Sequence, residues 1–350
     1  MTALLVALAL TVPAPRLTAR PPQLVVGQRW TATLVAPAPP RVRARLGGRT
    51  VTFRTTRVAA ARYRAVLVFQ SPGTWRLTAT IGRRETPLTR MAVVASYPLA
   101  SPAGILARDD RSLLVVERGG RDRVLHVRGD GRFTTFARDV PAPWGLAAAG
   151  GGALVSGNGG IYRISGPRVI YRISGPRVRA QQVASVDAGP FLVAPGGDLY
   201  YANRSEVGRV RAGSTRAETF AAEVSAPHGL ALDGDALYVS DSGNGRILRI
   251  DVRSGRVTVH AVGLRNVLGI ELEPDGTLLA VEFDTGRLLR IDAAGRTSVV
   301  AVRLVKPYAL DRAADGTVWV VETGELRTPT GRIARVGADG AVARLRLVPG

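Results

Sequence analysis

The sequence predicts an all-β protein in which a six-bladed β-propeller follows a small β-sandwich. Three observations predict this: a glycine-led motif that recurs about every forty residues, an alternating segment before the first repeat, and the lack of any helical pattern. Repeats of this length that hold several short strands are typical of propeller blades. One small sheet cannot bury both of its faces, whereas six sheets stacked around an axis can.

The repeat begins with a short anchor that ends in glycine in five of its six copies. The intervals between successive anchors are 41, 44, 40 and 40 residues, and Ala309 stands a further 40 residues on, where a sixth glycine would be. The five anchor glycines are Gly104, Gly145, Gly189, Gly229 and Gly269. Each anchor is followed by a second apolar strand such as ALYVSD, and then by a basic and apolar strand such as GRILRI. We therefore expect the propeller to occupy residues 97–350.

Composition narrows the classes of protein and site. The chain has 350 residues, which favours two domains over one. It contains no cysteine, which excludes disulfides and thiolate metal sites. Its 48 basic residues include a single lysine, Lys306, and the formal net charge is +21.

The first residues resemble a secretory signal. The run TALLVALALTV is too short to span a bilayer, and small residues follow it, so residues 1–19 are interpreted as a signal peptide. A buried strand or an incorrectly assigned start codon would give the same pattern. A signal peptide predicts a secreted, periplasmic or cell-envelope protein of a bacterium.

Residues 22–95 alternate polar and apolar positions in short runs separated by turn residues, which favours a β-sandwich. Residues 1–95 carry 15 arginines and one acid, Glu85, a net charge of +14. Arg41, Arg43 and Arg45 share one strand face, and Arg62 with Arg64 repeats the pattern. This face, with tryptophan and tyrosine nearby, would attract an anionic cell-envelope polymer or a lipid surface. The alternative is a solvated face without a partner; nucleic acid is not expected.

Chemistry is expected at the propeller edge where first strands begin and second strands end, because antiparallel neighbours meet there. Aromatic residues precede three anchors: Trp144, His228 and Tyr308. A polar residue ends the second strand of every repeat: Glu117, Asn158, Asn203, Asp241, Glu282 and Glu322. A ring of carboxylates with His228 could hold a divalent cation such as Ca²⁺, Mg²⁺ or Zn²⁺. We expect His228, Tyr308, Glu282 and Glu322 to face the axis, with Trp144 and Asp241 alongside.

A structural interpretation of the same polar residues stays open. In five repeats an arginine follows at the start of the third strand, so each pair could close a hairpin as an ion pair. The expected pairs are Glu117 with Arg123, Asn203 with Arg209, Asp241 with Arg246, Glu282 with Arg287, and Glu322 with Arg332. The two interpretations do not exclude each other.

The repeat unit APHGLALDGDALYVSDSGNGRILRI resembles the NHL repeat, and the resemblance covers residues 100–348. NHL-like propellers include scaffolds, sensors, lactonases and lyases, so the likeness does not select a function. The gluconolactonase family implies metal ligands at blade starts, but Ala103, Ala188 and Leu268 stand there. APHG, KPYA and VWVVE resemble the virginiamycin B lyase family, which implies candidate catalytic roles for His228, Tyr308 and Glu322. That family also implies a second channel histidine, whereas His126 and His260 fall on outer strands.

The segment YRAVLVFQSPGTWRLTAT, which lies in residues 22–95, resembles bacterial immunoglobulin-like domains.

The second repeat contains the nonapeptide IYRISGPRV twice, at residues 161–169 and 170–178. One copy suffices for the blade, so we expect the second to be extruded as a hairpin; a tandem slip in the gene or an assembly error would explain it.

The sequence as a whole predicts a secreted binding or scaffold protein that recognises a small molecule or protein at one rim of the propeller. The alternative is a metal-dependent lactonase-like hydrolase or a lyase at the central channel.

Overall fold

The computed structural model describes residues 13–138, 140–149, 152–164, 182–184, 188–324 and 330–349. The chain divides into two compact units, residues 1–97 with 348–350, and residues 98–347. Within the described residues the only helical segment is a 3-10 turn, Ser242–Asn244, so the all-β expectation is confirmed. The same residues include no helix that is both long and apolar enough to cross a membrane.

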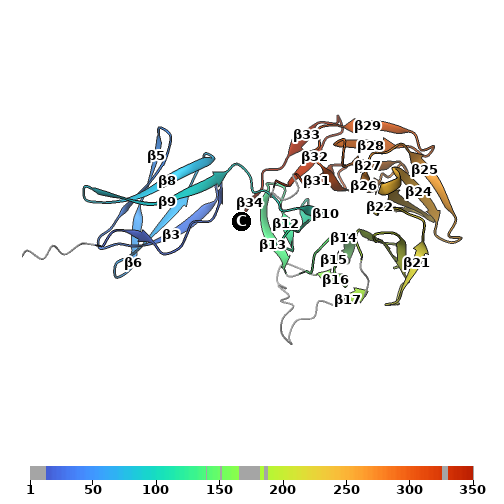
Figure 1. Cartoon of the computed structure of the whole chain (residues 1–350), viewed down its shortest axis with the longest axis horizontal. Helices are drawn as coiled ribbons and strands as arrows, with labels where there is room; N and C mark the ends of the chain where they lie inside the picture. The colour runs from blue at the N-terminus through green and yellow to red at the C-terminus, as the bar shows by residue number, and fades with distance from the viewer. Residues whose placement is uncertain are drawn as a thin grey trace, which may run out of the picture. The chain divides into compact units, whose positions relative to one another are not determined.

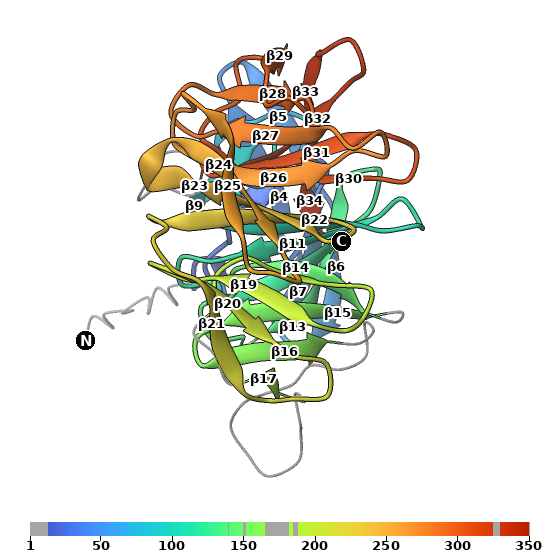
Figure 2. The ribbon, with the colours of Figure 1, turned by 90° about the vertical axis from the view of Figure 1, so that its right-hand side faces the viewer.

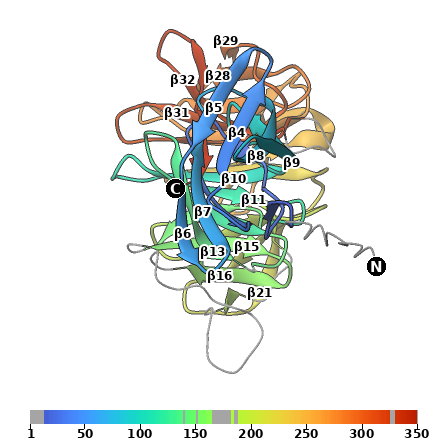
Figure 3. The ribbon, with the colours of Figure 1, turned by 90° about the vertical axis from the view of Figure 1, so that its left-hand side faces the viewer.

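The first unit consists of two sheets that share one core. Its strands are β1 (Arg16–Leu17), β2 (Leu24–Val25), β3 (Arg29–Val35), β4 (Arg41–Leu46), β5 (Arg49–Phe53), β6 (Thr55–Ala59), β7 (Arg62–Val68), β8 (Gly73–Ile81) and β9 (Arg84–Val94). One sheet has the order β1-β3-β7-β6 and the other β2-β9-β8-β4-β5; β6 with β7 and β4 with β5 are visible as neighbours in Figure 3. Leu34 and Leu67 of the first sheet pack with Trp75 and Leu77 of the second in a single buried cluster.

The first unit starts earlier in the chain than residue 22. Residues 1–12 of the expected signal segment lie outside the described residues. Arg16 and Leu17, also within that segment, form β1 and pair with Val35 and Leu34 of β3. Pro15, just before β1, is buried as well. The interpretation of residues 1–19 as a signal peptide stays a prediction.

Strand alternation separates the arginines of this unit from its aromatic residues. Arg41 and Arg45 are exposed, while Val42 and Ala44 between them are buried. The aromatic side chains were expected beside the arginine face, but Tyr63 and Trp75 are buried in the core. The reason is the period of two: Tyr63 lies between Arg62 and Arg64 and therefore points to the opposite side.

The second unit contains six sheets, and each of them includes four antiparallel strands that are consecutive in the chain. The first three comprise β10 (Pro102–Ala107), β11 (Leu113–Glu117), β12 (Arg123–Val127), β13 (Arg132–Arg138); β14 (Leu146–Ala149), β15 (Gly152–Gly157), β16 (Gly160–Ile164), β17 (Gln182–Ala184); and β18 (Phe191–Val193), β19 (Leu199–Ala202), β20 (Val207–Val210), β21 (Ala217–Ala221). Figure 2 shows β19, β20 and β21 side by side.

The other three sheets repeat this plan. They comprise β22 (Pro227–Asp233), β23 (Ala236–Asp241), β24 (Arg246–Asp251), β25 (Val257–Val262); β26 (Val267–Leu272), β27 (Leu278–Glu282), β28 (Arg287–Ile291), β29 (Thr297–Ala301); and β30 (Pro307–Arg312), β31 (Val318–Glu322), β32 (Arg332–Val336), β33 (Val342–Arg344). The last strand of the chain is β34 (Val348–Pro349).

The first strands of the six sheets form a closed ring. Contacts run from β10 to β14, β18, β22, β26 and β30, and β30 contacts β10 again. These strands lie toward the centre and strands such as β21, β25 and β29 lie at the periphery (Figure 1). A closed ring of small antiparallel sheets is a β-propeller, as the forty-residue period predicted.

The anchor glycines allow neighbouring first strands to approach closely. A Cβ atom added to Gly229 would lie 2.4 Å from the carbonyl oxygen of Leu268 on the next first strand. A Cβ atom added to Gly104 would lie 2.5 Å from the carbonyl oxygen of Trp144. A side chain at either position would therefore collide with backbone, which explains the recurrence of glycine there.

The repeated nonapeptide falls mostly on residues that the structure does not describe. Ile161 to Ile164 of the first copy complete β16, as expected for a third strand. The second copy, residues 170–178, lies outside the described residues, so its expected extrusion as a hairpin stays a prediction.

Candidate functional site

The four carboxylates that end second strands are completely buried. Glu117, Asp241, Glu282 and Glu322 each have a relative exposure of 0%. Each accepts a hydrogen bond from a backbone N–H in the connection that precedes the first strand of the same sheet. The four hydrogen bonds, each given from donor to acceptor, are Ala100 N to Glu117 (2.9 Å), Ser225 N to Asp241 (2.6 Å), Arg265 N to Glu282 (2.9 Å) and Val305 N to Glu322 (2.7 Å).

Arginines complete the environment of each carboxylate. Three of the ion pairs expected from spacing are present: Glu117 with Arg123, Asp241 with Arg246, and Glu282 with Arg287. Glu322 differs, because Arg344 of β33 binds both of its oxygens at 2.8 Å although Arg332 is its register partner. These contacts agree with the structural interpretation of the carboxylates. Each carboxylate joins the end of a second strand to the connection that leads into the first strand of the same sheet.

The two asparagines do not take part in ion pairs with third-strand arginines. Asn203 accepts backbone N–H groups from Ser205 and Glu206 and donates to the Glu206 carboxylate at 2.8 Å. Arg209, its expected partner, pairs with Glu218 instead. Asn158 is exposed, and its backbone N–H donates to the carbonyl of Pro141.

These contacts do not form a metal site. The oxygens of all four carboxylates accept protein N–H groups, and none of the four residues lines the central cavity. Glu282 and Glu322 thus do not face the axis as expected, because the backbone N–H groups that they accept lie in the connections between sheets. No group of three or more His, Asp or Glu residues capable of holding a metal exists among the residues that the structure describes.

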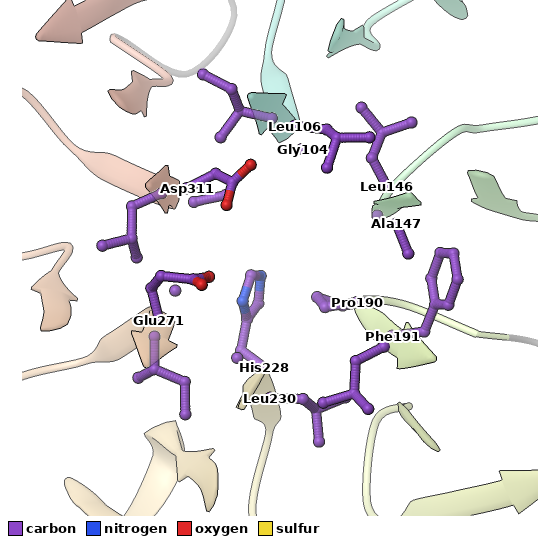
Figure 4. A pocket seen from close by; sticks show the side chains of 18 of the residues that line it. Gly104, Leu106, Leu146, Ala147, Pro190, Phe191, His228, Leu230, Glu271 and Asp311 are labelled. Atoms are coloured by element: carbon purple, nitrogen blue, oxygen red, sulfur yellow. The ribbon is translucent and has the colours of Figure 1, made fainter. Parts of the chain in front are cut away.

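A cavity of about 300 Å³ lies on the axis and is lined by residues of all six first strands. Most of the side chains that line it are apolar, including those of Leu106, Leu146 and Phe191. Three titratable side chains point into it: His228, Glu271 and Asp311 (Figure 4).

His228 is the buried histidine that the sequence placed at the rim. It is the second residue of β22 and is 8% exposed, and neither ring nitrogen has a hydrogen-bond partner among the described residues. Burial, with a smaller contribution from the positive charge of Arg118, lowers the pKa of His228 to about 3. The imidazole is therefore neutral at pH 7, with one nitrogen free to donate and the other to accept.

Aromatic residues surround His228 on one side. Its ring lies 4.7 Å from that of Tyr308 in an edge-to-face arrangement and 6.5 Å from that of Trp144. Phe283 lies 6.4 Å from Tyr308. We call Trp144, His228, Phe283 and Tyr308 the aromatic end. Burial raises the pKa of Tyr308 to about 12, so its phenol stays protonated.

Two cations lie over the rings of the aromatic end. The guanidinium of Arg118 stands 3.8 Å from the centre of the Trp144 ring, and the ammonium of Lys306 stands 4.7 Å from that of Phe283. The rings of His228, Tyr308 and Trp144 thus lie within 6.5 Å of one another. Arg118 and Phe283 directly follow the last residue of a second strand, and Lys306 stands just before the anchor position Ala309. These positions in the repeat could have marked the three residues as candidates for the site.

Two carboxylates in the cavity were missed by the sequence reasoning. Glu271 and Asp311 each stand two residues after an anchor position, Gly269 and Ala309. Burial raises the pKa of Asp311 to about 6, and burial together with the nearby charge of Asp311 raises the pKa of Glu271 to about 8. We call these two residues the acidic end. Their shared offset in otherwise apolar strands was the available signal.

The other histidines stay away from the cavity. His126 lies in β12 near Phe136, and His260 lies in β25 with its ring 4.9 Å from that of Tyr238. The axis therefore has one histidine, and no second imidazole reaches His228 from the described strands.

A family model matches residues 27–259, which is more than half of the chain; the family is described as outer membrane protein assembly factor BamB. The chain belongs to this BamB family. The match begins within the first unit and ends in the fourth sheet of the second. No curated protein is significantly similar to the chain in sequence.

Solved structures share the propeller fold at low identity. A gluconolactonase from Xanthomonas campestris is 18% identical, with 85% of this chain and 98% of that chain covered and a TM-score of 0.54. Regucalcin, a calcium-binding protein from Agrobacterium tumefaciens, is 16% identical, with 72% and 94% covered and a TM-score of 0.52. Virginiamycin B lyase from Staphylococcus aureus is 20% identical, with 70% and 84% covered and a TM-score of 0.50. At these identities the likeness concerns the fold alone.

Proposed function

We propose that this BamB-family chain is a binding protein of the bacterial cell envelope whose six-bladed, NHL-like propeller holds a small aromatic anion at the aromatic end. The family's description as an outer-membrane assembly factor supports the location. His228 carries the proposal, because a buried imidazole with two unpaired nitrogens loses hydrogen bonds to water that a ligand can restore.

The surroundings of His228 define the ligand's chemistry. An aromatic ring would stack against Trp144 and Tyr308, whose rings already pack against each other at 6.4 Å in a tilted arrangement. A carboxylate on that ring would meet the guanidinium of Arg118, which supplies a charge-assisted hydrogen bond. The neutral ring of His228 would donate a further hydrogen bond to the same group.

Calorimetric titration with 2-naphthoate tests this proposal, with the neutral 2-naphthamide as the matched probe. We expect 2-naphthoate to bind and 2-naphthamide to bind at least about tenfold more weakly, since a charge-assisted hydrogen bond contributes about 1.5–3 kcal/mol. Arg118→Gln and His228→Leu should each weaken binding of 2-naphthoate by a similar factor. Arg128→Gln, which removes an equal charge from an exposed site, is the control. Equal binding of both probes, or equal loss in the control, would refute the site.

A metal-dependent hydrolase or lyase is the second candidate, and the neutral His228 beside Tyr308 is the observation that favours it. A neutral imidazole can accept a proton from a substrate, but a pKa of about 3 makes His228 a weak base at pH 7. The four carboxylates at the ends of second strands are engaged by N–H groups, and no group of three possible metal ligands occurs among the residues that the structure describes, so no step through a cation is assigned. Elemental analysis of untagged protein decides the matter: one equivalent of a divalent cation, lost in His228→Ala, would favour the enzyme.

For the first unit we propose an immunoglobulin-like sandwich that holds the protein near an anionic envelope polymer or lipid surface. Its outer face supports this, because Arg45, Arg76 and Arg90 are exposed and occupy register positions on adjacent strands β4, β8 and β9. Such a row brings like charges together, which is unfavourable without a partner. Glu85 lies near one end of the row, 3.5 Å from Arg45.

Sedimentation with phosphatidylglycerol vesicles and retention on alginate test the two sources of anionic charge. We expect binding to one of them that weakens as salt rises, since the Debye length falls to about 3 Å at 1 M. Changing Arg45, Arg76 and Arg90 together to glutamine should abolish it. The same change at three exposed arginines of the second unit, Arg128, Arg211 and Arg253, is the control. If neither support binds the protein more than phosphatidylcholine does, the proposal is rejected.

A further inference from the structure

The acidic end of the cavity has no role in the function proposed above. Glu271 and Asp311 occupy equivalent positions on β26 and β30, which are neighbouring first strands. Both carboxylates point into the cavity (Figure 4), whereas the side chains around them are mostly apolar. Two acids in an apolar wall are costly to bury unless a partner compensates for their charge.

The two carboxylates differ in their protein partners. Asp311 accepts the backbone N–H of Ala107 at 2.5 Å and that of Arg312 at 2.9 Å, which fixes its orientation. No hydrogen bond or ion pair to the Glu271 side chain occurs within the described residues, although Arg312 is near enough to act on its pKa. Glu271 therefore presents oxygens to the cavity that only a proton, water or a ligand can satisfy.

A second observation in the same cavity points to a ligand. His228 is 92% buried, since only 8% of it is exposed, and its unpartnered ring projects into the cavity from β22. Counted from the anchor, His228 and Glu271 stand three residues apart along equivalent strands, which corresponds to about 10 Å. Two unsatisfied polar groups, the imidazole of His228 and the carboxyl group of Glu271, thus line the same cavity.

We propose that Glu271 and Asp311 form a binding site for a primary ammonium group, carried by a small organic molecule whose apolar part lies along the cavity wall. An ammonium group offers three N–H donors and a positive charge, which suits two carboxylates of which one is already oriented by backbone N–H groups. The cavity of about 300 Å³ is at the lower end of the range for small-molecule sites.

Binding at this site releases a proton. The groups facing Glu271 are Asp311 and Arg312 from β30 and the neutral His228 from β22, and the net result is a Glu271 pKa of about 8. At pH 7 the Glu271 carboxyl is therefore mostly protonated, and the incoming ammonium replaces that proton, which passes to solvent. Roughly one proton should be released per ligand at pH 7, and far fewer at pH 9.5, where the carboxylate is already ionised.

Calorimetry with n-butylammonium tests the inference, with 1-butanol as the neutral probe of equal size. Titrations at pH 7 in two buffers of different ionisation enthalpy, neither containing a primary amine, measure the protons released. We expect n-butylammonium to bind with release of about one proton at pH 7, more tightly at pH 9, and 1-butanol not to bind measurably. Glu271→Gln should weaken binding at least about tenfold and abolish proton release.

Variants and ions distinguish ammonium binding here from metal binding and from binding elsewhere on the protein. Asp311→Asn should also weaken binding. This variant can lose the hydrogen bond from Ala107 N and fold poorly, in which case Glu271→Gln remains informative. Glu273→Gln is the control, because that carboxylate binds Arg290 outside the cavity. Unchanged binding in Glu271→Gln, binding without proton release at pH 7, or stabilisation by Ca²⁺ but not by the amine would overturn the inference. The amine has neither a ring nor a negative charge, so these outcomes leave the 2-naphthoate site to its own test.

Discussion

Alanine at Gly229 is expected to destabilise the protein by about 3 kcal/mol, because overpacking against rigid backbone commonly costs 1–3 kcal/mol or more. The new Cβ would lie 2.4 Å from the carbonyl oxygen of Leu268 and 2.6 Å from the backbone nitrogen of Ile270. Both atoms belong to the next first strand, so relief requires the ring of sheets to open. Urea denaturation of the full chain measures the effect.

Gly196→Ala is the matched control for this change. No atom lies within 4 Å of a Cβ at Gly196, so its free energy of unfolding should change by less than about 0.5 kcal/mol. Equal effects at the two glycines would show that close strand approach does not explain the recurring anchor.

Arg246→Ala is expected to cost about 3 kcal/mol, since removal of one partner leaves a buried carboxylate uncompensated and such losses are typically 3–5 kcal/mol. Asp241 is completely buried and would keep only the neutral donors Ser225 N and Asn244. Thermal and urea unfolding of the variant would detect the loss.

An exposed pair provides the comparison for Arg246. Arg253 and Asp235 are 80% and 47% exposed, so Arg253→Ala should change stability by no more than about 1 kcal/mol. If Arg246→Ala is equally mild, the buried carboxylates do not join the strands as the contacts indicate, and their availability for a ligand would have to be reconsidered.

The features that depend on sequence spacing were predictable. The period of the anchors predicted the strands around the axis. The short spacing between second and third strands, as between Asp241 and Arg246, predicted the three ion pairs that are present. Glu322 departs from this pattern because a longer connection precedes Arg332, and a side chain from the fourth strand, Arg344, reaches the carboxylate instead.

The functional site was only partly predictable for a different reason. His228, Trp144 and Tyr308 precede anchors, and that shared position indicated one rim. Glu271 and Asp311 lie within first strands, whereas the sequence pattern singled out residues at strand ends. Hydrogen bonds between segments 16 or 17 residues apart, such as that from Arg265 N to Glu282, decide which carboxylates are free, and composition does not encode these bonds.

The most direct test of the aromatic end is NMR of the protein labelled with ¹⁵N in its histidine rings. The chain has three histidines, His126, His228 and His260, so single variants assign every ring signal. With a pKa of about 3, the ring of His228 should stay neutral from pH 8 to pH 5. Added 2-naphthoate should shift the signals of His228 and leave those of His126 and His260 in place. Titration of His228 near pH 6.5, or shifts confined to the other two rings, would contradict a ligand site at the buried imidazole.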